Sequence, residues 1–104
     1  MAISHLYGLI GYPLGHSFSK AYFTEKFEKL GLSETHAYEQ FPIPSIDEFK
    51  AILAANPNLK GLNVTIPYKQ VVMPLLDEID LAAAQIGAVN TIKIAADGYT
   101  RGYN

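Results

Sequence analysis

The sequence contains no cysteine, and its charged residues are few and nearly balanced. Without cysteine the chain cannot form disulfides, use a thiolate nucleophile or hold zinc or iron–sulfur sites through thiolate ligands. Eight basic and ten acidic residues give a formal net charge of −2, which favours neither nucleic acid nor an anionic membrane as a partner. We therefore expect no metal site, no nucleic-acid partner and no membrane partner.

Long hydrophobic runs and targeting signals are also missing. The strongest apolar run, residues 71–76, is too short to span a bilayer. The first residues, Met1 to His5, contain neither a basic segment nor an apolar targeting run. A chain of 104 residues fits one domain, and a domain of this size can bury roughly 60 to 70% of its unfolded surface. We therefore expect a single soluble, cytoplasmic domain over residues 1–104.

Hydrophobic periodicity predicts an alternation of strands and helices along the chain. Strands are expected at residues 6–11, 35–41, 59–66, 88–94 and 99–104. Helices are expected at residues 17–30, from 45 onward, at 67–76 and at 81–86. The last two strands flank Asp97-Gly98, a strong hairpin signal, and should be antiparallel. This order predicts an α/β domain with a mostly parallel open sheet, an antiparallel hairpin strand at the C-terminal end and helices on both faces.

Helical spacing also predicts which side chains of the first two helices face the core. They are Phe23, Phe27, Leu30, Ile46, Phe49, Ile52 and Leu53. The second helix has capping-box spacing between Ser45 and Glu48. The seven tyrosines, Tyr38 among them, are assigned to packing rather than to chemistry.

The most informative stretch is N-V-T-I-P-Y-K at residues 63–69. Side chains alternate along a strand, so Asn63 and Thr65 share one face. Pro67 suits the first position of a helix, which places Lys69 in a first helical turn. A cation there opposes the helix dipole, so the position calls for a local explanation. Either the stretch forms a small-molecule site, or Lys69 is an exposed lysine with a solvated head.

A second polar cluster, G-Y-P-L-G-H-S-F-S at residues 11–19, follows the first predicted strand at the edge where open α/β sheets bind ligands. The hydroxyls of Ser17 and Ser19, with free N–H groups at a helix N-terminus, suit a carboxylate or phosphate, although one serine could simply cap the helix. His16 is either an acid–base group or a structural or exposed histidine. The glycines do not form G-x-G-x-x-G, so no dinucleotide site is predicted.

A third cluster, G-A-V-N-T at residues 87–91, contains Asn90. In the predicted strand this residue shares a face with apolar side chains. Burying an unpaired amide costs about 1 to 3 kcal/mol, so backbone groups or a ligand must satisfy Asn90. Both alternatives remain open from the sequence.

Taken together, the three motifs resemble the shikimate dehydrogenase family, in the order and at the spacing of that family's N-terminal substrate-binding domain. The resemblance covers essentially the whole chain. It implies an NADP-dependent oxidoreductase that reduces 3-dehydroshikimate to shikimate in aromatic amino-acid biosynthesis. It also implies that a separate C-terminal Rossmann domain holds the nicotinamide cofactor.

The resemblance assigns roles to the polar residues. Ser17 and Ser19 would hold the carboxylate of shikimate or 3-dehydroshikimate. Asn63, Thr65 and Asn90 would bind ring hydroxyls or orient the catalytic lysine.

Lys69 would be that catalytic acid–base group, because reduction of a ketone needs a proton donor at the developing alkoxide. The sequence departs from the family pattern at Lys20, where proline is usual, and at Phe23-Thr24, where the family has His-Asn. The family's G-x-N-T-D motif is matched only as far as Gly102-Tyr103-Asn104. The aspartate that partners the lysine has no match here, so the chain alone is expected to bind no cofactor and to be inactive.

Three other interpretations are kept. The nearest is a quinate or shikimate dehydrogenase that uses NAD. A stand-alone binding module for small hydroxylated carboxylates would have the same polar clusters without catalysis. In a structural or interaction domain, the clusters would satisfy only one another. The sequence also leaves open whether two copies form a homodimer.

Overall fold

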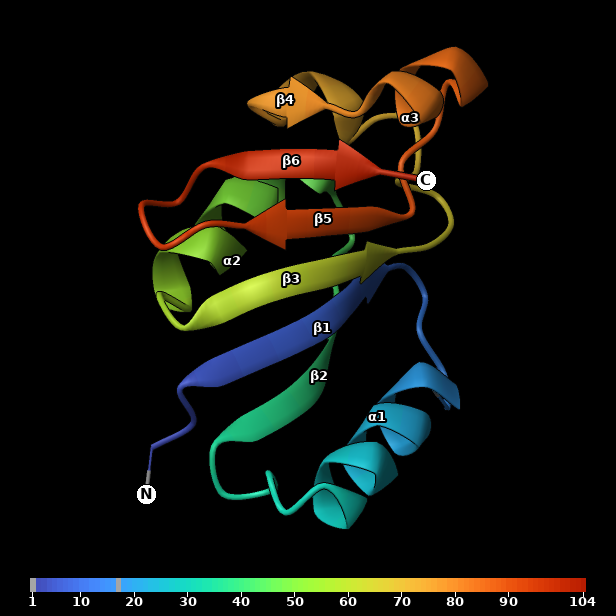
Figure 1. Cartoon of the computed structure of the whole chain (residues 1–104). Coiled ribbons are helices and arrows are strands. Elements are labelled where there is room, and N and C mark those ends of the chain that lie inside the picture. The colour runs from blue at the N-terminus through green and yellow to red at the C-terminus, as the bar shows by residue number, and fades with distance from the viewer. Residues whose placement is uncertain (1, 17) are drawn as a thin grey trace.

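The computed structural model of this protein describes residues 2–16 and 18–104. Its centre is a six-stranded sheet with strand order β2-β1-β3-β5-β6-β4 (Figure 1). The strands are β1 (His5–Gly11), β2 (His36–Pro42), β3 (Leu59–Val64), β4 (Glu78–Ile79), β5 (Thr91–Ile94) and β6 (Thr100–Tyr103). The helices are α1 (Phe18–Lys29), α2 (Phe49–Ala55), α3 (Leu81–Ile86) and the 3-10 turns η1 (Ile46–Glu48) and η2 (Met73–Leu75).

The sheet is mixed in the way that the sequence predicts. Strand β1 pairs in parallel with both β2 and β3, and β4 pairs in parallel with β6. Strand β5 runs antiparallel to β3 and to β6. Helices α1 and α2 lie on opposite faces of the sheet (Figure 1). The predicted α/β class is therefore confirmed, with β5 as the reversed strand of the C-terminal hairpin.

The hydrophobic core lies on the face of the sheet that α2 covers. Ile10, Leu62 and Ile92, from three neighbouring strands, are all buried in one cluster with Phe49 of α2. The capping box of η1 is present: the Asp47 N–H donates to the Ser45 hydroxyl, and the Ser45 N–H donates to Glu48. Local capping therefore starts this helical segment where the sequence predicts it, and α2 closes over the core.

The opposite face is covered only partly, because α1 packs against the β1–β2 side of the sheet. Phe23 and Phe27 are half-buried and form ring contacts with Tyr38 and Tyr7 of the sheet. No residue of α1, all of whose positions 18–29 are described, is fully buried. Leu30, predicted to face the core, is 60% exposed. That prediction is wrong because Leu30, which follows the end of α1 at Lys29, borders an open groove on this face of the sheet and is not packed under other side chains.

The predicted helix after Pro67 is also wrong. Residues 65–72 form turns, and the only helical segment of this stretch, all of which is described, is the 3-10 turn η2. Pro74 follows Pro67 by seven positions, and so short a segment lacks the length that a stable helix needs. Strand β3 likewise ends at Val64, and Ile66, expected on its buried face, is 73% exposed.

The later elements follow their local signals. Helix α3 matches the predicted residues 81–86 and ends at Gly87, whose φ of 80° is the left-handed conformation that glycine adopts without strain. Gly98, with φ 89°, makes the turn between β5 and β6. Strand β4, only two residues long, was not predicted. Within the described residues, no helix has the length and apolar character needed to cross a membrane.

Candidate functional site

Four of the predicted site residues, Asn63, Thr65, Lys69 and Asn90, lie around the carboxyl ends of β1 and β3, where main-chain hydrogen bonds hold three segments together. The Thr65 N–H donates to the Ile10 carbonyl at 2.9 Å, which extends the β1–β3 pairing one residue beyond β3. The Val64 N–H donates to the Asn90 carbonyl at 2.9 Å. The end of β3 is therefore fixed to β1 on one side and to the segment before β5 on the other.

Lys69 lies in the loop that follows this edge. Its carbonyl accepts a hydrogen bond from the Val89 N–H at 2.8 Å, which places the loop beside Asn90. Since no helix begins at Pro67, no helix dipole acts on the lysine, contrary to the sequence prediction. The Lys69 side chain is exposed, and within the described part of the chain it forms no ion pair with a carboxylate. It is therefore a free ammonium at the rim of the edge.

Asn90 precedes β5 instead of lying inside it, so its predicted place on an apolar strand face is wrong. Its N–H donates to the Tyr103 carbonyl at 2.9 Å. The side-chain oxygen accepts from the Thr91 hydroxyl at 3.1 Å, and the amide nitrogen donates to the Asn104 side chain at 3.5 Å. The partners of this amide are therefore neighbouring side chains, not the backbone groups that the sequence analysis offers as the alternative to a ligand.

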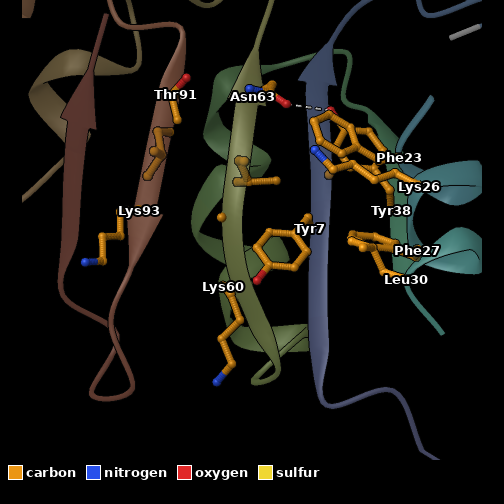
Figure 2. Close-up of a pocket in the computed structure, with 14 residues that line it drawn as sticks. Tyr7, Phe23, Lys26, Phe27, Leu30, Tyr38, Lys60, Asn63, Thr91 and Lys93 are labelled. Atoms are coloured by element: carbon orange, nitrogen blue, oxygen red, sulfur yellow. Dashed lines mark hydrogen bonds between the residues drawn. The ribbon is translucent and has the colours of Figure 1, made fainter. Parts of the chain in front are cut away.

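Asn63 is half-buried on the face that α1 partly covers, and it is bonded to Tyr38 of β2. The Tyr38 hydroxyl donates to the Asn63 side-chain oxygen at 2.8 Å (Figure 2). Tyr38 is 3% exposed and its ring stacks on Phe23 of α1, with centroids 5.0 Å apart. Burial raises the pKa of the Tyr38 phenol, and hydrogen bonding from the Ser19 side chain acts against that rise. Tyr38 thus connects Ser19 on α1 with Asn63 on β3.

Sequence reasoning missed Tyr38 as a member of this cluster, since it assigned every tyrosine to packing. No local signal points to it, because Asn63 follows 25 positions later and meets it only through the order of strands in the sheet. Ser17 lies outside the described residues. His16 is exposed in the loop before α1.

Two hollows adjoin the cluster. An apolar groove of about 300 Å³ runs between α1 and the open face of the sheet, with Asn63 near one end (Figure 2). A second hollow of about 360 Å³ is lined by Thr65 together with Gly15 and His16. Lys69 and Asn90 line neither of the two, so the predicted residues share an edge of the sheet rather than a single closed cavity.

The close approach of β1 to Thr65 depends on Gly11. A Cβ atom at this position would lie 2.5 Å from the Thr65 methyl group and 3.0 Å from the Ile66 carbonyl oxygen. Such distances are shorter than van der Waals contact, so only glycine fits without a shift of its neighbours. Gly11 therefore sets how closely the end of β1 approaches Thr65.

The described residues fit neither a metal ion nor a dinucleotide. Among residues 2–16 and 18–104, no group of three or more histidine, cysteine, aspartate or glutamate side chains is placed to hold a metal ion. The loop between β1 and α1 lacks the glycine spacing that lets a backbone approach a pyrophosphate. What the edge does offer is hydroxyl, amide and ammonium groups, a set that suits a small polyhydroxylated anion.

Comparison with known proteins decides the family. The model of the shikimate dehydrogenase substrate binding domain matches residues 9–92, which is most of the chain. The chain belongs to this family. A curated relative, the NADP(+) shikimate dehydrogenase of Halothermothrix orenii, is 45% identical over 97 residues, which are 93% of this chain and 33% of that protein. The chain therefore spans about a third of the length of such relatives.

Solved structures agree with this shikimate dehydrogenase domain in fold. Shikimate 5-dehydrogenase from Thermus thermophilus, in complex with shikimate, superimposes with a TM-score of 0.83 at 31% identity, covering 96% of this chain and 38% of that one. Quinate dehydrogenase from Corynebacterium glutamicum, in complex with NAD, gives 0.81 at 38% identity, covering 99% and 38%. Both similarities extend over nearly the whole domain.

Proposed function

We propose that this chain is the substrate-binding domain of an NADP-dependent shikimate dehydrogenase, and that it binds shikimate and 3-dehydroshikimate. The observation that carries the proposal is the frame of main-chain hydrogen bonds that sets Asn63, Thr65, Lys69 and Asn90 on one edge of the sheet. The names of the curated relatives supply the substrate and the cofactor.

The polar side chains at this edge can be assigned to the carboxylate and to the ring hydroxyls of such a substrate. Ser17 and Ser19 would donate hydrogen bonds to the carboxylate, and Ser19 lies in the first turn of α1, where a helix N-terminus also favours an anion. Asn63, Thr65 and Asn90 would contact the ring hydroxyls. Because Asn90 is already bonded to Thr91 and Asn104, its role is to bind through a remaining amide hydrogen or lone pair.

Lys69 would act as the proton donor in ketone reduction. In that reaction the nicotinamide supplies the hydride, and the described residues offer no site for it, so this chain deals only with the substrate and the proton. The Lys69 ammonium would stabilise the developing alkoxide and give it a proton, and the lysine would be left neutral. Its exposed position at the rim leaves the amine free to reach a ligand.

A titration of the 104-residue chain with shikimate tests the binding step. We expect shikimate to shift the backbone amide NMR signals around Ser19, Asn63 and Thr65, while those of α2 stay in place. The same chain supplied with shikimate and NADP+ should form no NADPH. Signals that do not move at millimolar shikimate would contradict the proposal, and so would clear turnover by the chain alone.

Quinate is the rival substrate, and the similarity to the Corynebacterium quinate dehydrogenase is the observation that favours testing it. Quinate carries an additional ring hydroxyl, so a site built for shikimate must either leave room for it or exclude it. We expect quinate to shift the same signals only at higher concentration than shikimate. Equal or tighter binding of quinate would favour the rival.

A further inference from the structure

We propose that Tyr38 is a positioning residue of the substrate site, because its hydroxyl fixes the orientation of the Asn63 amide and so makes Asn63 a hydrogen-bond donor toward the ligand. This inference rests on the proposed function and adds a residue to it. It assigns a direction to the Asn63 contact, which neither the family resemblance nor the motif spacing provides.

The geometry starts from the hydroxyl of Tyr38. The Tyr38 hydroxyl has one hydrogen to donate, and this hydrogen goes to the Asn63 side-chain oxygen at 2.8 Å. The Ser19 side chain approaches the same phenol from α1 as a donor, which leaves the phenol's own hydrogen for Asn63. The hydrogen bond from Tyr38 to Asn63 thus joins β2 to β3, with the Ser19 side chain of α1 beside the same phenol.

The remaining atoms of Asn63 point to the ligand. With its oxygen held by Tyr38, the amide presents its nitrogen, which carries two hydrogens and can only donate. Within the described residues this nitrogen has no hydrogen-bond partner, and it is not among the fully buried polar atoms. Figure 2 shows the amide at the upper end of the groove, beside the tyrosine and away from Lys60. A ligand at Asn63 must therefore offer an acceptor oxygen.

The Tyr38 ring is also locked in place, so the hydroxyl cannot follow a mobile partner. It is buried, and it stacks on Phe23 at an interplanar angle of 17°. A rigid donor restricts the amide to one of its two flipped orientations, because the opposite flip would place two donors face to face. A ring that served only to pack would not need this hydroxyl, and that difference can be tested.

The test uses Tyr38→Phe, which keeps the ring and removes only the hydroxyl. Tyr99→Phe is the matched control, since the Tyr99 hydroxyl also donates to a side-chain oxygen, that of Glu78 at 3.1 Å, but far from this edge. In the 104-residue chain, without ligand, we expect Tyr38→Phe to shift the Asn63 side-chain NH2 signals and to increase their motion on the nanosecond timescale. Tyr99→Phe should leave them unchanged. Unchanged Asn63 signals in Tyr38→Phe would overturn the inference whether or not shikimate binds.

Ligand binding gives the second readout. We expect Tyr38→Phe to weaken shikimate binding about fivefold to tenfold, the size of one lost neutral hydrogen bond, and to have no further effect in an Asn63→Ala background. Asn63→Asp, which can accept from Tyr38 but cannot donate, should lose at least as much affinity as Asn63→Ala. Retained affinity in Asn63→Asp would show that Asn63 is an acceptor and would overturn the assigned direction. If the wild-type chain fails to bind shikimate at all, the proposed function fails, while the ligand-free signals still decide the role of Tyr38.

Discussion

The backbone N–H of Val89 donates to the carbonyl of Lys69 at 2.8 Å, and this bond fixes the lysine loop beside the segment that carries Asn90. The contact uses only main-chain atoms. The Lys69 side chain is exposed and contributes nothing to it, so the position of the loop does not depend on the amine. The side chain can therefore be replaced without moving the loop.

The first prediction concerns Lys69→Ala. In an intact shikimate dehydrogenase that contains this domain, we expect kcat to fall by about 10²- to 10⁴-fold, the usual contribution of a general acid. The denaturant midpoint should stay within error of wild type, because the Val89 bond is retained. Lys29→Ala, which removes an exposed lysine paired with Glu25 on α1, is the control for loss of charge and should leave turnover unchanged. Near-normal turnover of Lys69→Ala would show that the acid–base assignment is wrong.

A second prediction uses two glycines of one loop. Gly11→Ala places a methyl group 2.5 Å from the Thr65 side chain, whereas a Cβ atom at Gly15 meets nothing within 4 Å. We expect Gly11→Ala to destabilise the fold by about 1 to 3 kcal/mol through overpacking and to weaken shikimate binding through the displaced Thr65. Gly15→Ala should change neither quantity appreciably. Urea unfolding and the shikimate titration measure both effects, and equal behaviour of the two variants would contradict the contact geometry.

The third prediction is a pH dependence of stability that arises at Asp77 and Thr100. The Asp77 carboxylate accepts from the Thr100 N–H at 2.8 Å and from the Thr100 hydroxyl at 3.0 Å. These hydrogen bonds, the backbone one first, lower the pKa of Asp77 below its ordinary value of 3.8. The folded state therefore holds its proton less tightly than the unfolded state. The resulting stabilisation is present above the unfolded-state pKa and is lost as the pH falls through the lower folded-state value.

Two substitutions at Thr100 isolate the hydroxyl's share of this effect. Thr100 is 1% exposed, so its shape matters as well as its hydrogen bonds. Thr100→Val keeps the shape and removes the hydroxyl, and it should flatten the fall in unfolding free energy between pH 5 and the acid limit. Thr100→Ser keeps the hydroxyl and should preserve the slope at a lower overall stability. Urea midpoints measured across this pH range decide the matter, and parallel curves for wild type and Thr100→Val would contradict it.

The fourth prediction compares two apolar residues that the sequence places alike in the core. Phe49 is fully buried under the sheet, whereas Leu30 is 60% exposed beyond the end of α1. Phe49→Ala should lower the free energy of unfolding by about 3 to 5 kcal/mol. Leu30→Ala should change it by no more than about 0.5 kcal/mol, as is usual for an exposed position. Chemical denaturation gives both values, and a large loss at Leu30 would mean that α1 covers more of the sheet than the structure shows.

The parts of the fold that the sequence predicts well are those with a local physical signal. The Ser45–Glu48 capping box, the left-handed Gly87 after α3 and the Asp97-Gly98 turn each depend on residues a few positions apart. The antiparallel pairing of β5 with β3 has no local signal of its own. The hairpin turn at Gly98 does predict, however, that one of the two strands it joins runs against the other. These features need no knowledge of distant contacts.

The failures arise where distant contacts decide. The segment after Pro67 forms turns and not the expected helix. The carbonyl of Lys69 in this segment is bonded to the N–H of Val89, a residue about twenty positions away. Strand alternation correctly places Asn63 on the face of the sheet away from the core. Its partner Tyr38 lies on β2, which is separated from β3 by β1 in the sheet, so the sequence alone does not bring the two residues together. Asn90 falls just before β5, although its carbonyl and N–H still bond to Val64 and Tyr103 on the two sides of that strand. The roles of the six predicted site residues remain predictions.

A frame built from main-chain hydrogen bonds also affects how this domain can change over evolutionary time. The bonds between Thr65 and Ile10, between Val64 and Asn90, and between Val89 and the loop carbonyl use only main-chain atoms, and Gly11 is the position of the frame where an added side chain would collide with Thr65. Residues on that edge can therefore be exchanged to suit a differently substituted ring while the scaffold stays the same. New ligand preferences should be obtainable by substitution at a few surface positions, with little loss of stability.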